Sequence, residues 1–401
     1  MDAPIVKDQV PFTGLAFKLQ ADATTYAAPD TTDMVGIANL SIKPNDITQQ
    51  DPRYNGTIHR PGDLIVGTTY DVTYDVPLCG PGGSAPPVAG AFILGRMLRT
   101  LGFTENVVSA AIPVAAENLG AGSTVTEAIL GTTAAATADL YKGLAVALPG
   151  AGSVTAATLS MIAAYDAAKK ATLAERFDSA LTGKYQIPQQ LAYTLSGSDA
   201  PPIASVVTWQ GNLRMEFQGF APSAATLTLP TAARDGGGDL PRLSLTYSGE
   251  LHGYSQESCP ALSLATTVPP FKGGKMMIAG KRMGGSSISL DLSPRVGFRP
   301  NPNRSSGSES AELVETRRSM GLNLNRTALS YLDILALRTA QSKHPIQALY
   351  GYGSGNYIGF MAADARFASP EPQVGGDFYT DQVTAYLDDP SKAVSIVFPY
   401  F

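Results

Sequence analysis

Apolar and polar residues alternate along many short stretches of this chain, and a helical spacing replaces the alternation in two places. In TYDVTYDV, residues 69–76, every second residue is apolar, which is the period of a half-buried β-strand. In AFILGRMLRTLGF, residues 91–103, the apolar positions recur at i, i+3, i+4 and i+7, as in an amphipathic helix; they are Leu94, Met97, Leu98 and Leu101. The pattern predicts a mainly β protein with few helices.

Several of these elements occur twice. GGDLPRLSLTYSG begins at Gly237, and GGDFYTDQVTAYL begins at Gly375. The strand LSIKP, residues 40–44, corresponds to LDLSP, residues 290–294. TYDVTYDV corresponds to RSMGLNLN, residues 318–325, in which Met320, Leu322 and Leu324 alternate. An internal repeat determines how the whole fold is interpreted, so the shared order of these elements is the strongest structural evidence in the sequence.

A helix and a hairpin complete each set. The second helix is expected in TALSYLDILALRTAQ, with a stripe of Ala328, Tyr331, Leu332 and Leu335. The hairpins are expected to turn at Gly211-Asn212 and at Gly355-Asn356, because these residues adopt the positive φ that tight turns need. Five elements thus recur in one order. We predict two copies of one unit, over about 36–255 and 281–390, each a small β-barrel or sandwich with one flanking helix.

The copies and the sequence around them suggest a division of the chain. The first copy carries an extra stretch rich in Ala, Gly, Thr and Ser, for which its alanines suggest helix. The short runs LAVAL, SMIAAY and ATLAERF, separated by turn residues, favour β instead. The predicted parts are an N-terminal arm (1–35), a first domain (36–103 and 190–255), an inserted surface β module (104–189), a linker (256–280) and a second domain with a C-terminal arm (281–401).

Both ends of the chain are candidates for contacts with other subunits. The first 35 residues resemble an arm that reaches an adjacent subunit. The apolar tail AVSIVFPYF, residues 393–401, either completes its own sheet or pairs with a neighbour, since a monomer would not leave it bare. The sequence slightly favours pairing of this tail within its own domain.

Composition excludes several functions. Charged residues make up 16% of the chain, against roughly 25% in ordinary soluble domains, so part of the surface is expected to be covered by neighbours. The net charge of −5 argues against nucleic-acid binding through phosphate contacts. The start MDAPIVKDQV is unlike a signal peptide, and no apolar run is long enough to span a membrane. We therefore expect a protein made in a reducing cytoplasm, with no membrane partner.

No catalytic, cofactor-binding or metal-binding residue is predicted. His59, His252 and His344 are scattered, and Cys79 and Cys259 have no ligand spacing. The remaining candidates are GKY at Gly183, Gly353-Ser354-Gly355, the acids of Asp235–Asp239 and the single tryptophan, Trp209. Each lacks the further residues that a phosphate loop, nucleophile elbow, calcium loop or stacking platform requires. The sequence indicates a protein that is not an enzyme.

The run from Tyr193 to Gln256 resembles the tail tube (major tail) proteins of long-tailed bacteriophages. The resemblance rests on an aromatic strand, a glycine-containing hairpin turn, a Gly-Phe ending, a glycine-rich linker and the strand PRLSLTYSG at 241–249, in this order. The strand 40–44, a loop with Arg60-Pro61 and TYDVTYDV fit the early part of that family. It covers most of the chain outside 104–189.

The resemblance implies a virion structural protein that self-assembles. Rings of subunits would stack into a hollow tube, through which genome DNA passes without specific binding during ejection. Two tandem copies per chain favour a trimeric ring with pseudo-sixfold symmetry. Further partners would be the tape measure, terminator and distal tail proteins. The implied location is the virion tail, assembled in the cytoplasm of the host bacterium.

Two excursions follow the same strand in each copy, DITQQDPRYNGTIHRPGD (46–63) and RVGFRPNPNRSSGSESAELVET (295–316), and suit contacts between stacked rings. Glu216 and Asp364 are acids on the hairpin strands that would repel DNA if they faced the channel. Alternation alone does not tell which face that is.

Other classes of protein fit the sequence less well. A different phage tail protein, such as a terminator, hub or sheath-like subunit, is the nearest alternative. A carbohydrate-binding surface β protein would use Trp209 and the inserted module, but it would need a secretion signal.

Overall fold

The computed structural model describes most of the chain. The described residues are 13–22, 25–50, 62–148, 159–195, 201–232, 239–262, 266–297, 299, 301, 303, 312–316, 318–375, 378–387 and 394–401. His59, Arg60-Pro61 and most of Asp235–Asp239 lie outside these residues, so the structure does not address the predictions made for them.

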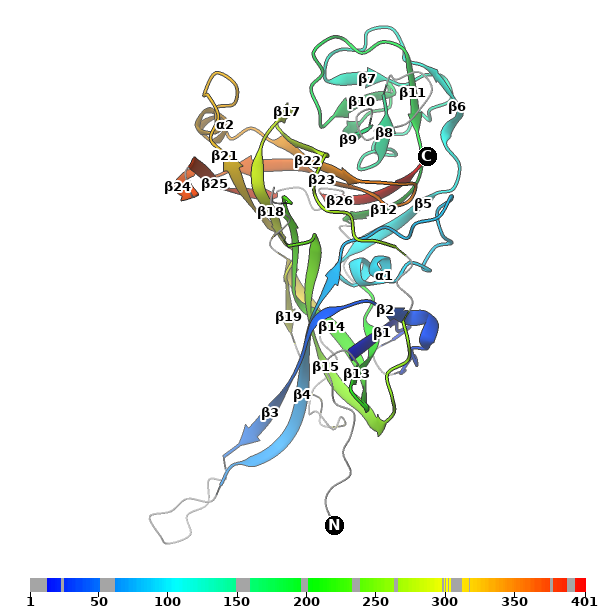
Figure 1. The fold of residues 1–401 in the computed structure, drawn as a ribbon, viewed down its shortest axis with the longest axis vertical. Helices are drawn as coiled ribbons and strands as arrows, with labels where there is room; N and C mark the ends of the chain where they lie inside the picture. The colour runs from blue at the N-terminus through cyan, green and yellow to red at the C-terminus, as the bar shows by residue number, and fades with distance from the viewer. Residues whose placement is uncertain are drawn as a thin grey trace.

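The protein is mainly β, as predicted. Its described part contains one 18-stranded sheet, one six-stranded sheet and one two-stranded sheet. The α-helices are short, namely α1 (Ile93–Thr100) and α2 (Ile334–Ala340). In Figure 1 the large sheet extends along the molecule, and the six-stranded sheet lies at one end beside the C-terminus.

The two copies have the same elements and the same strand pairing. In the first copy the antiparallel order is β3 (Ala38–Gln49), β4 (Leu64–Pro77), β15 (Arg242–Gln256), β14 (Leu213–Pro230) and β13 (Ala204–Gln210). In the second copy it is β18 (Gly285–Asp291), β21 (Ser319–Asn325), β25 (Phe378–Leu387), β23 (Tyr357–Phe367) and β22 (His344–Gly351). The predicted hairpin between β13 and β14 turns at Gly211, whose φ is 62°, and Gly355 lies in the second turn with a φ of 67°.

The alternating residues form one core that spans both copies. Val72, Tyr74 and Val76 on β4 are buried, and Met320, Leu322 and Leu324 on β21 are buried in the same cluster. The two predicted domains therefore share a core as well as a sheet. Apolar burial of this extent is the main stabilising term of the fold.

The N-terminal segment is part of the first copy. β1 (Thr13–Leu19) pairs with β13, and its Leu15 and Phe17 are buried in the shared core. β16 (Lys275–Ile278) pairs with β22 in the equivalent place of the second copy. The predictions of an arm over 1–35 that reaches an adjacent subunit and of a linker over 256–280 are therefore wrong for residues 13–19 and 275–278. Burying these apolar residues on their own sheet leaves none of them for a neighbour.

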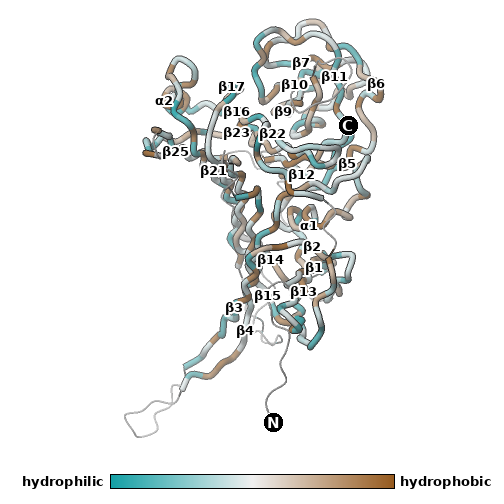
Figure 2. The backbone as a smooth tube through the Cα atoms, viewed as in Figure 1, coloured by the Kyte–Doolittle hydropathy of each residue, from teal (hydrophilic) through white to brown (hydrophobic). Residues whose placement is uncertain are grey.

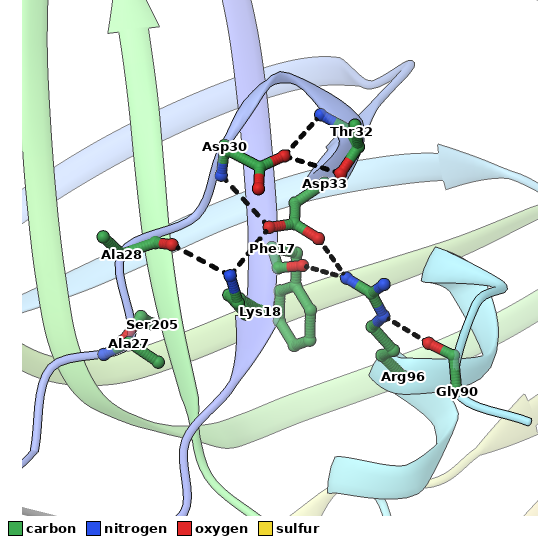
Figure 3. Close-up of polar contacts among 10 residues, drawn as sticks. All are labelled: Phe17, Lys18, Ala27, Ala28, Asp30, Thr32, Asp33, Gly90, Arg96 and Ser205. Carbon is green, nitrogen blue, oxygen red and sulfur yellow. Dashed lines mark hydrogen bonds and ion pairs between the residues drawn. The ribbon is translucent and has the colours of Figure 1, made fainter.

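Ion pairs fix the segment after β1 onto helix α1 (Figure 3). The short 3-10 helix η2 (Thr31–Asp33) leads into β2 (Met34–Val35), which pairs with β1. Asp33 is buried, and its carboxylate lies 2.5 Å from the Arg96 guanidinium and 3.6 Å from Lys18 Nζ. Removing both cations would leave the buried Asp33 carboxylate unpaired, so these contacts hold the segment in place.

The first predicted helix is confirmed and the second is shorter than predicted. Leu94, Met97, Leu98 and Leu101 are all buried. α2 starts only after Asp333, whose side-chain oxygen accepts a hydrogen bond from the Ala336 amide as an N-cap. The predicted stripe residues Ala328, Tyr331 and Leu332 thus precede the helix, and Leu335 is exposed.

The inserted module consists of β-strands, as the short runs LAVAL, SMIAAY and ATLAERF predicted, and it is smaller than predicted. Its six strands are β6 (Ile112–Asn118), β7 (Glu127–Ile129), β8 (Ala145–Ala147), β9 (Leu159–Tyr165), β10 (Lys170–Leu173) and β11 (Lys184–Ile187). The flanking strands β5 (Phe103–Val108) and β12 (Gln189–Leu195) pair with each other in the large sheet.

The module packs on the second copy, although it is inserted in the first. Its core includes Leu349, Met361, Ala363 and Val397 from that copy. β26 (Val394–Tyr400), the apolar tail, pairs with β23 of its own copy and also with β12. The module and the tail therefore tie the two copies together.

The predicted excursions continue their strands. β3 runs to Gln49 and β4 starts at Leu64, and this hairpin projects from the body of the molecule (Figure 1). In the second copy, β19 (Pro294–Gly297) and β20 (Glu312–Thr316) form a separate two-stranded ribbon beyond β18 and β21. β17 (Lys281–Arg282) pairs with β16, and β24 (Glu371–Gly375) with β25.

Candidate assembly surfaces

A strand junction inside the chain joins the two copies. Residues Thr226–Pro230 of β14 pair antiparallel with Ser287–Asp291 of β18. The junction makes one run of eight strands, in the order β3, β4, β15, β14, β18, β21, β25 and β24. One copy thus attaches to the next by adding its first strand to an exposed edge of the other.

One side of this run is mainly polar; it also carries the exposed Tyr386, opposite Ser319, and Glu371, opposite Gln382. The side chains that alternate with the core residues lie opposite one another across the strands, for example Thr73 opposite Thr246 and Ser289 opposite Gly321. We call this side the polar face and define it by Ser41, Lys43, Asp71, Thr73, Asp75, Thr226, Thr228, Arg242, Ser244, Thr246, Ser248, Ser287, Ser289, Asp291, Ser319, Gly321, Asn323, Gln382 and Thr384. Hydroxyl and amide groups dominate it.

Two carboxylates of the polar face are held by neutral donors on the neighbouring strands. Asp71 accepts hydrogen bonds from Ser248 Oγ at 2.5 Å and from Asn45 Nδ2 at 2.7 Å. Asp75 accepts them from Ser244 Oγ at 2.5 Å and from Asn39 Nδ2 at 2.7 Å. These bonds join β3, β4 and β15. Two cations lie near the carboxylates on the same face: the Arg242 guanidinium is 3.9 Å from Asp75, and Lys43 lies opposite Asp71.

The two ends of the eight-stranded run are open edges in the described part of the chain. There, β3 pairs with β4 alone and β24 pairs with β25 alone. An open edge presents unpaired N–H and C=O groups that a strand of another chain can bind. These are the same two kinds of edge that meet at the β14–β18 junction.

Exposed apolar side chains gather close to both edges. At the β24–β25 hairpin, Val374 is 75% and Phe378 77% exposed. On the projecting β3–β4 hairpin, Ile47, Leu64, Ile65 and Val66 are exposed, and Figure 2 shows hydrophobic segments along it. Apolar groups clustered in this way mark surfaces that another protein covers.

The residues considered for chemistry are dispersed. The His252 ring stacks on Tyr26, and His344 Nε2 hydrogen-bonds to Ser342 Oγ while burial lowers the pKa of its imidazole. Cys79 and Cys259 are unpaired thiols. Within the described ranges, no three His, Cys, Asp or Glu side chains gather as a metal site requires.

Trp209 is not available as a stacking platform. Its side chain is 4% exposed and packs with Ala16, Met34 and Val207, while the Arg214 guanidinium lies 5.9 Å from its ring centre. A sugar or base would need a bare ring face. The aromatic serves as an anchor of the β1–β13 pair instead.

The two acids on the hairpin strands do not lie on the polar face. Glu216 forms an ion pair with Arg214 at 2.8 Å and lies opposite Val207, on the side of the Trp209 cluster. Asp364 pairs with Lys142 of the inserted module at 3.5 Å. Sequence reasoning missed Asp71 and Asp75, although both alternate with the apolar residues of TYDVTYDV.

A buried ion pair joins the module to the second copy. Lys275 Nζ lies 2.7 Å from Glu175 of the module and donates to the Leu159 carbonyl at 3.0 Å. Burial lowers the pKa of Lys275, and the Glu175 carboxylate opposes that shift. Both side chains are almost fully buried, which fixes the module rigidly on the sheet.

Scans of the chain against models of known protein families and against curated proteins found no match. The α-helices that the structure describes have 8 and 7 residues and are too short to cross a lipid bilayer. The fold and its surfaces are therefore the basis for inferring a function.

Proposed function

We propose that this protein is the subunit of a bacteriophage tail tube, in which three chains close into a ring and rings stack into a hollow conduit for DNA. The observation that carries the proposal is the β14–β18 junction, together with open edges of the same two kinds at β3 and β24. The resemblance described above points to the same class of protein.

The ring is built by repeating the internal junction between chains. The outer edge of β24 corresponds to that of β14, and the outer edge of β3 to that of β18, because the two copies pair alike. Pairing β24 of one chain with β3 of the next would continue the sheet. A heterologous contact of this kind gives a closed ring when its rotation closes. Two copies per chain then make a pseudo-sixfold ring from three chains.

The polar face would line the channel. Its apolar counterpart is buried in the shared core, so only the polar side is free to face a lumen. Serine, threonine, asparagine and glutamine side chains offer a hydrated wall. Its described charges are Asp71, Asp75, Asp291 and Glu371 against Lys43 and Arg242, so it carries no cluster of cations. Lys and Arg clusters are what bind DNA phosphates, so such a wall would let a duplex slide.

The remaining surfaces have places in the same arrangement. The β3–β4 hairpin projects far enough from the body to reach a neighbouring ring, and its exposed apolar residues would be covered there. The module packs on β22, β23 and β26 on the side of the sheet away from the core, and we place it on the outside of the tube. The assembly site would be the host cytoplasm and the final location the virion tail.

Negative-stain electron microscopy and native mass spectrometry of the purified full-length chain test this function. We expect hollow tubes or rings, with three chains in each ring. Rings of six chains would overturn the trimer. A chain that stays monomeric at every concentration, or forms solid fibres, would overturn the tube, and single rings that never stack would favour a terminator-like protein.

A further inference from the structure

A second contact between the two copies, distinct from the strand junction, suggests which residues meet between chains. In this internal seam, the loop after β4 rests on the β22–β23 turn of the second copy. The Gly80 amide donates to Asn356 Oδ1 at 2.9 Å, and the Gly82 amide donates to the Gly355 carbonyl at 3.2 Å. Asn356 Nδ2 donates in turn to the Thr267 carbonyl at 2.9 Å.

The seam is a tight contact between backbones. A Cβ atom on Gly80 would lie 1.9 Å from the Gly355 carbonyl oxygen, so no other residue fits there without a shift of the backbone. Asn356 is buried by the contact. A hydrogen bond between groups buried in this way is costly to lose, which makes the seam a specific joint.

The counterparts of both seam partners present exposed residues in the single chain, although Gly211 itself is buried and Asn212 is partly buried. The counterpart of the Asn356 turn is Gly211-Asn212, where Asn212 Oδ1 accepts only from the exposed Ser258 Oγ among the bonds described, at 3.1 Å. Leu213, the next residue, is exposed. The counterpart of the loop after β4 is the loop after β21, residues 326–332.

The loop after β21 is ordered, yet it presents an apolar residue to solvent. Arg326 holds its start through Asp381 at 2.8 Å, and Tyr331 holds its end by donating to the Arg282 carbonyl at 3.0 Å. The Tyr331 amide donates to the Ala328 carbonyl at 2.8 Å and closes a turn. Leu329 lies at the tip of this turn and is 66% exposed.

We propose that the loop 326–332 of one chain docks on the Gly211-Asn212 turn of the next chain, with Leu329 as its anchor. The occupant is a second copy of this chain, because the internal seam already joins the counterparts of these two elements in the same order along the sheet. This inference rests on the proposed ring, in which the β24 edge and the loop 326–332 both belong to the second copy. β3 and the Gly211 turn both belong to the first copy and face the other way.

Cysteine cross-linking tests the contact directly. In a background of Cys79→Ser and Cys259→Ser, a chain carrying both Asn212→Cys and Leu329→Cys is assembled and treated with a short bis-maleimide. We expect covalent dimers and trimers in a denaturing gel. A chain carrying Leu140→Cys with Leu329→Cys is the control. Leu140 is an exposed leucine of the module and belongs to neither element, so this chain should stay monomeric.

A second variant measures the contribution of the anchor. Leu329→Glu should raise the concentration needed for half-assembly about tenfold or more, which corresponds to about 1.4 kcal/mol, while Leu140→Glu should not change it. Circular dichroism and the urea midpoint should be those of the wild type for both variants.

The outcomes separate this contact from the ring itself. Rings that form without 212–329 cross-links, or with Leu329→Glu assembling normally, would overturn the docking and leave the ring intact. A wild-type chain that forms no ring at all would overturn both. Cross-links between positions 140 and 329 as strong as those between 212 and 329 would also refute the docking, because they would show random collisions.

Discussion

Close packing at single residues explains why some small side chains are required. Gly95 lies in helix α1 against Tyr193, and a Cβ atom there would be 1.8 Å from the tyrosine oxygen. Tyr193 is fully buried and donates to Glu105 at 2.7 Å, so it has no room to move. Packing against Tyr193, rather than helix propensity, therefore requires glycine at position 95.

Gly95→Ala should destabilise the protein by about 1–3 kcal/mol, the usual cost of overpacking, although alanine favours a helix by about 1 kcal/mol over glycine. Urea unfolding followed by circular dichroism measures the change. Gly253→Ala is the matched control, because a Cβ atom there meets nothing within 4 Å. Equal stability of the two variants would contradict the packing argument.

Buried tyrosines give the fold a dependence on alkaline pH. Burial raises the pKa of Tyr74, Tyr193, Tyr247 and Tyr350 well above the ordinary value. The folded state keeps these protons at a pH where unfolded tyrosines, with a pKa of about 10, release them. The unfolded state then binds fewer protons, so stability falls as pH rises above about 10.

We expect each such tyrosine to lower the free energy of unfolding by about 1.4 kcal/mol per pH unit above pH 10. Urea titrations between pH 8 and pH 11 measure the slope. Tyr350→Phe should make it shallower, because Tyr350 is fully buried. Lys275 acts in the opposite direction through its lowered pKa, but it is a single group. A stability that stays flat to pH 11 would be inconsistent with buried phenols.

At the scale of elements, the strand edges decide whether the chain stays alone. β14 is long enough to pair with β15 on one edge and with β18 on the other. The corresponding outer edge of β24 has no partner in the described chain. Natural proteins protect such edges with charged residues, above all lysine. β24 carries one charged residue, Glu371, and Pro372, but its Val374 is an apolar side chain that is mostly exposed.

Val374→Lys should therefore weaken assembly while the monomer stays folded. Val114→Lys is the matched control, because Val114 is an equally exposed valine, at 80%, on the module and away from both edges. Sedimentation velocity should show a shift from rings to monomers for the first variant alone. If both variants assemble like the wild type, the β24 edge is not the joining surface.

At the scale of the whole molecule, the module packs on the sheet of the second copy. It covers Leu349, Met361, Ala363 and Val397, which no other described part of the chain would cover. Val108 of β5 and Gln190 of β12 lie opposite each other in the sheet. A short turn could therefore connect these two strands in place of the module.

Deleting residues 110–188 in this way should cause aggregation or a loss of several kcal/mol, because each fully buried apolar side chain contributes about 1.5–3 kcal/mol. Size-exclusion chromatography and urea unfolding measure the outcome. Adding Leu349→Thr, Met361→Thr and Val397→Thr to the deletion should restore solubility. A deletion variant that is soluble and stable without these changes would show that the module is a removable decoration.

Periodicity alone identified the repeated strands, the first helix, both hairpin turns and the order of the repeat, but it missed β1 and β16. These features depend on local rules, since a buried face needs alternation and a tight turn needs a residue with positive φ. The second helix was misplaced because a turn at Ala328 and a cap at Asp333 overrode an apolar spacing.

The tertiary structure decided where the pieces meet. Strand pairing between distant segments placed β1 and β16 inside the copies, put the module on the second copy and joined β14 to β18. Nothing local encodes these contacts, because each depends on which edge and which apolar face remain open after the rest of the chain has folded. For the same reason, the sequence showed two copies but only the fold showed which of their surfaces are free.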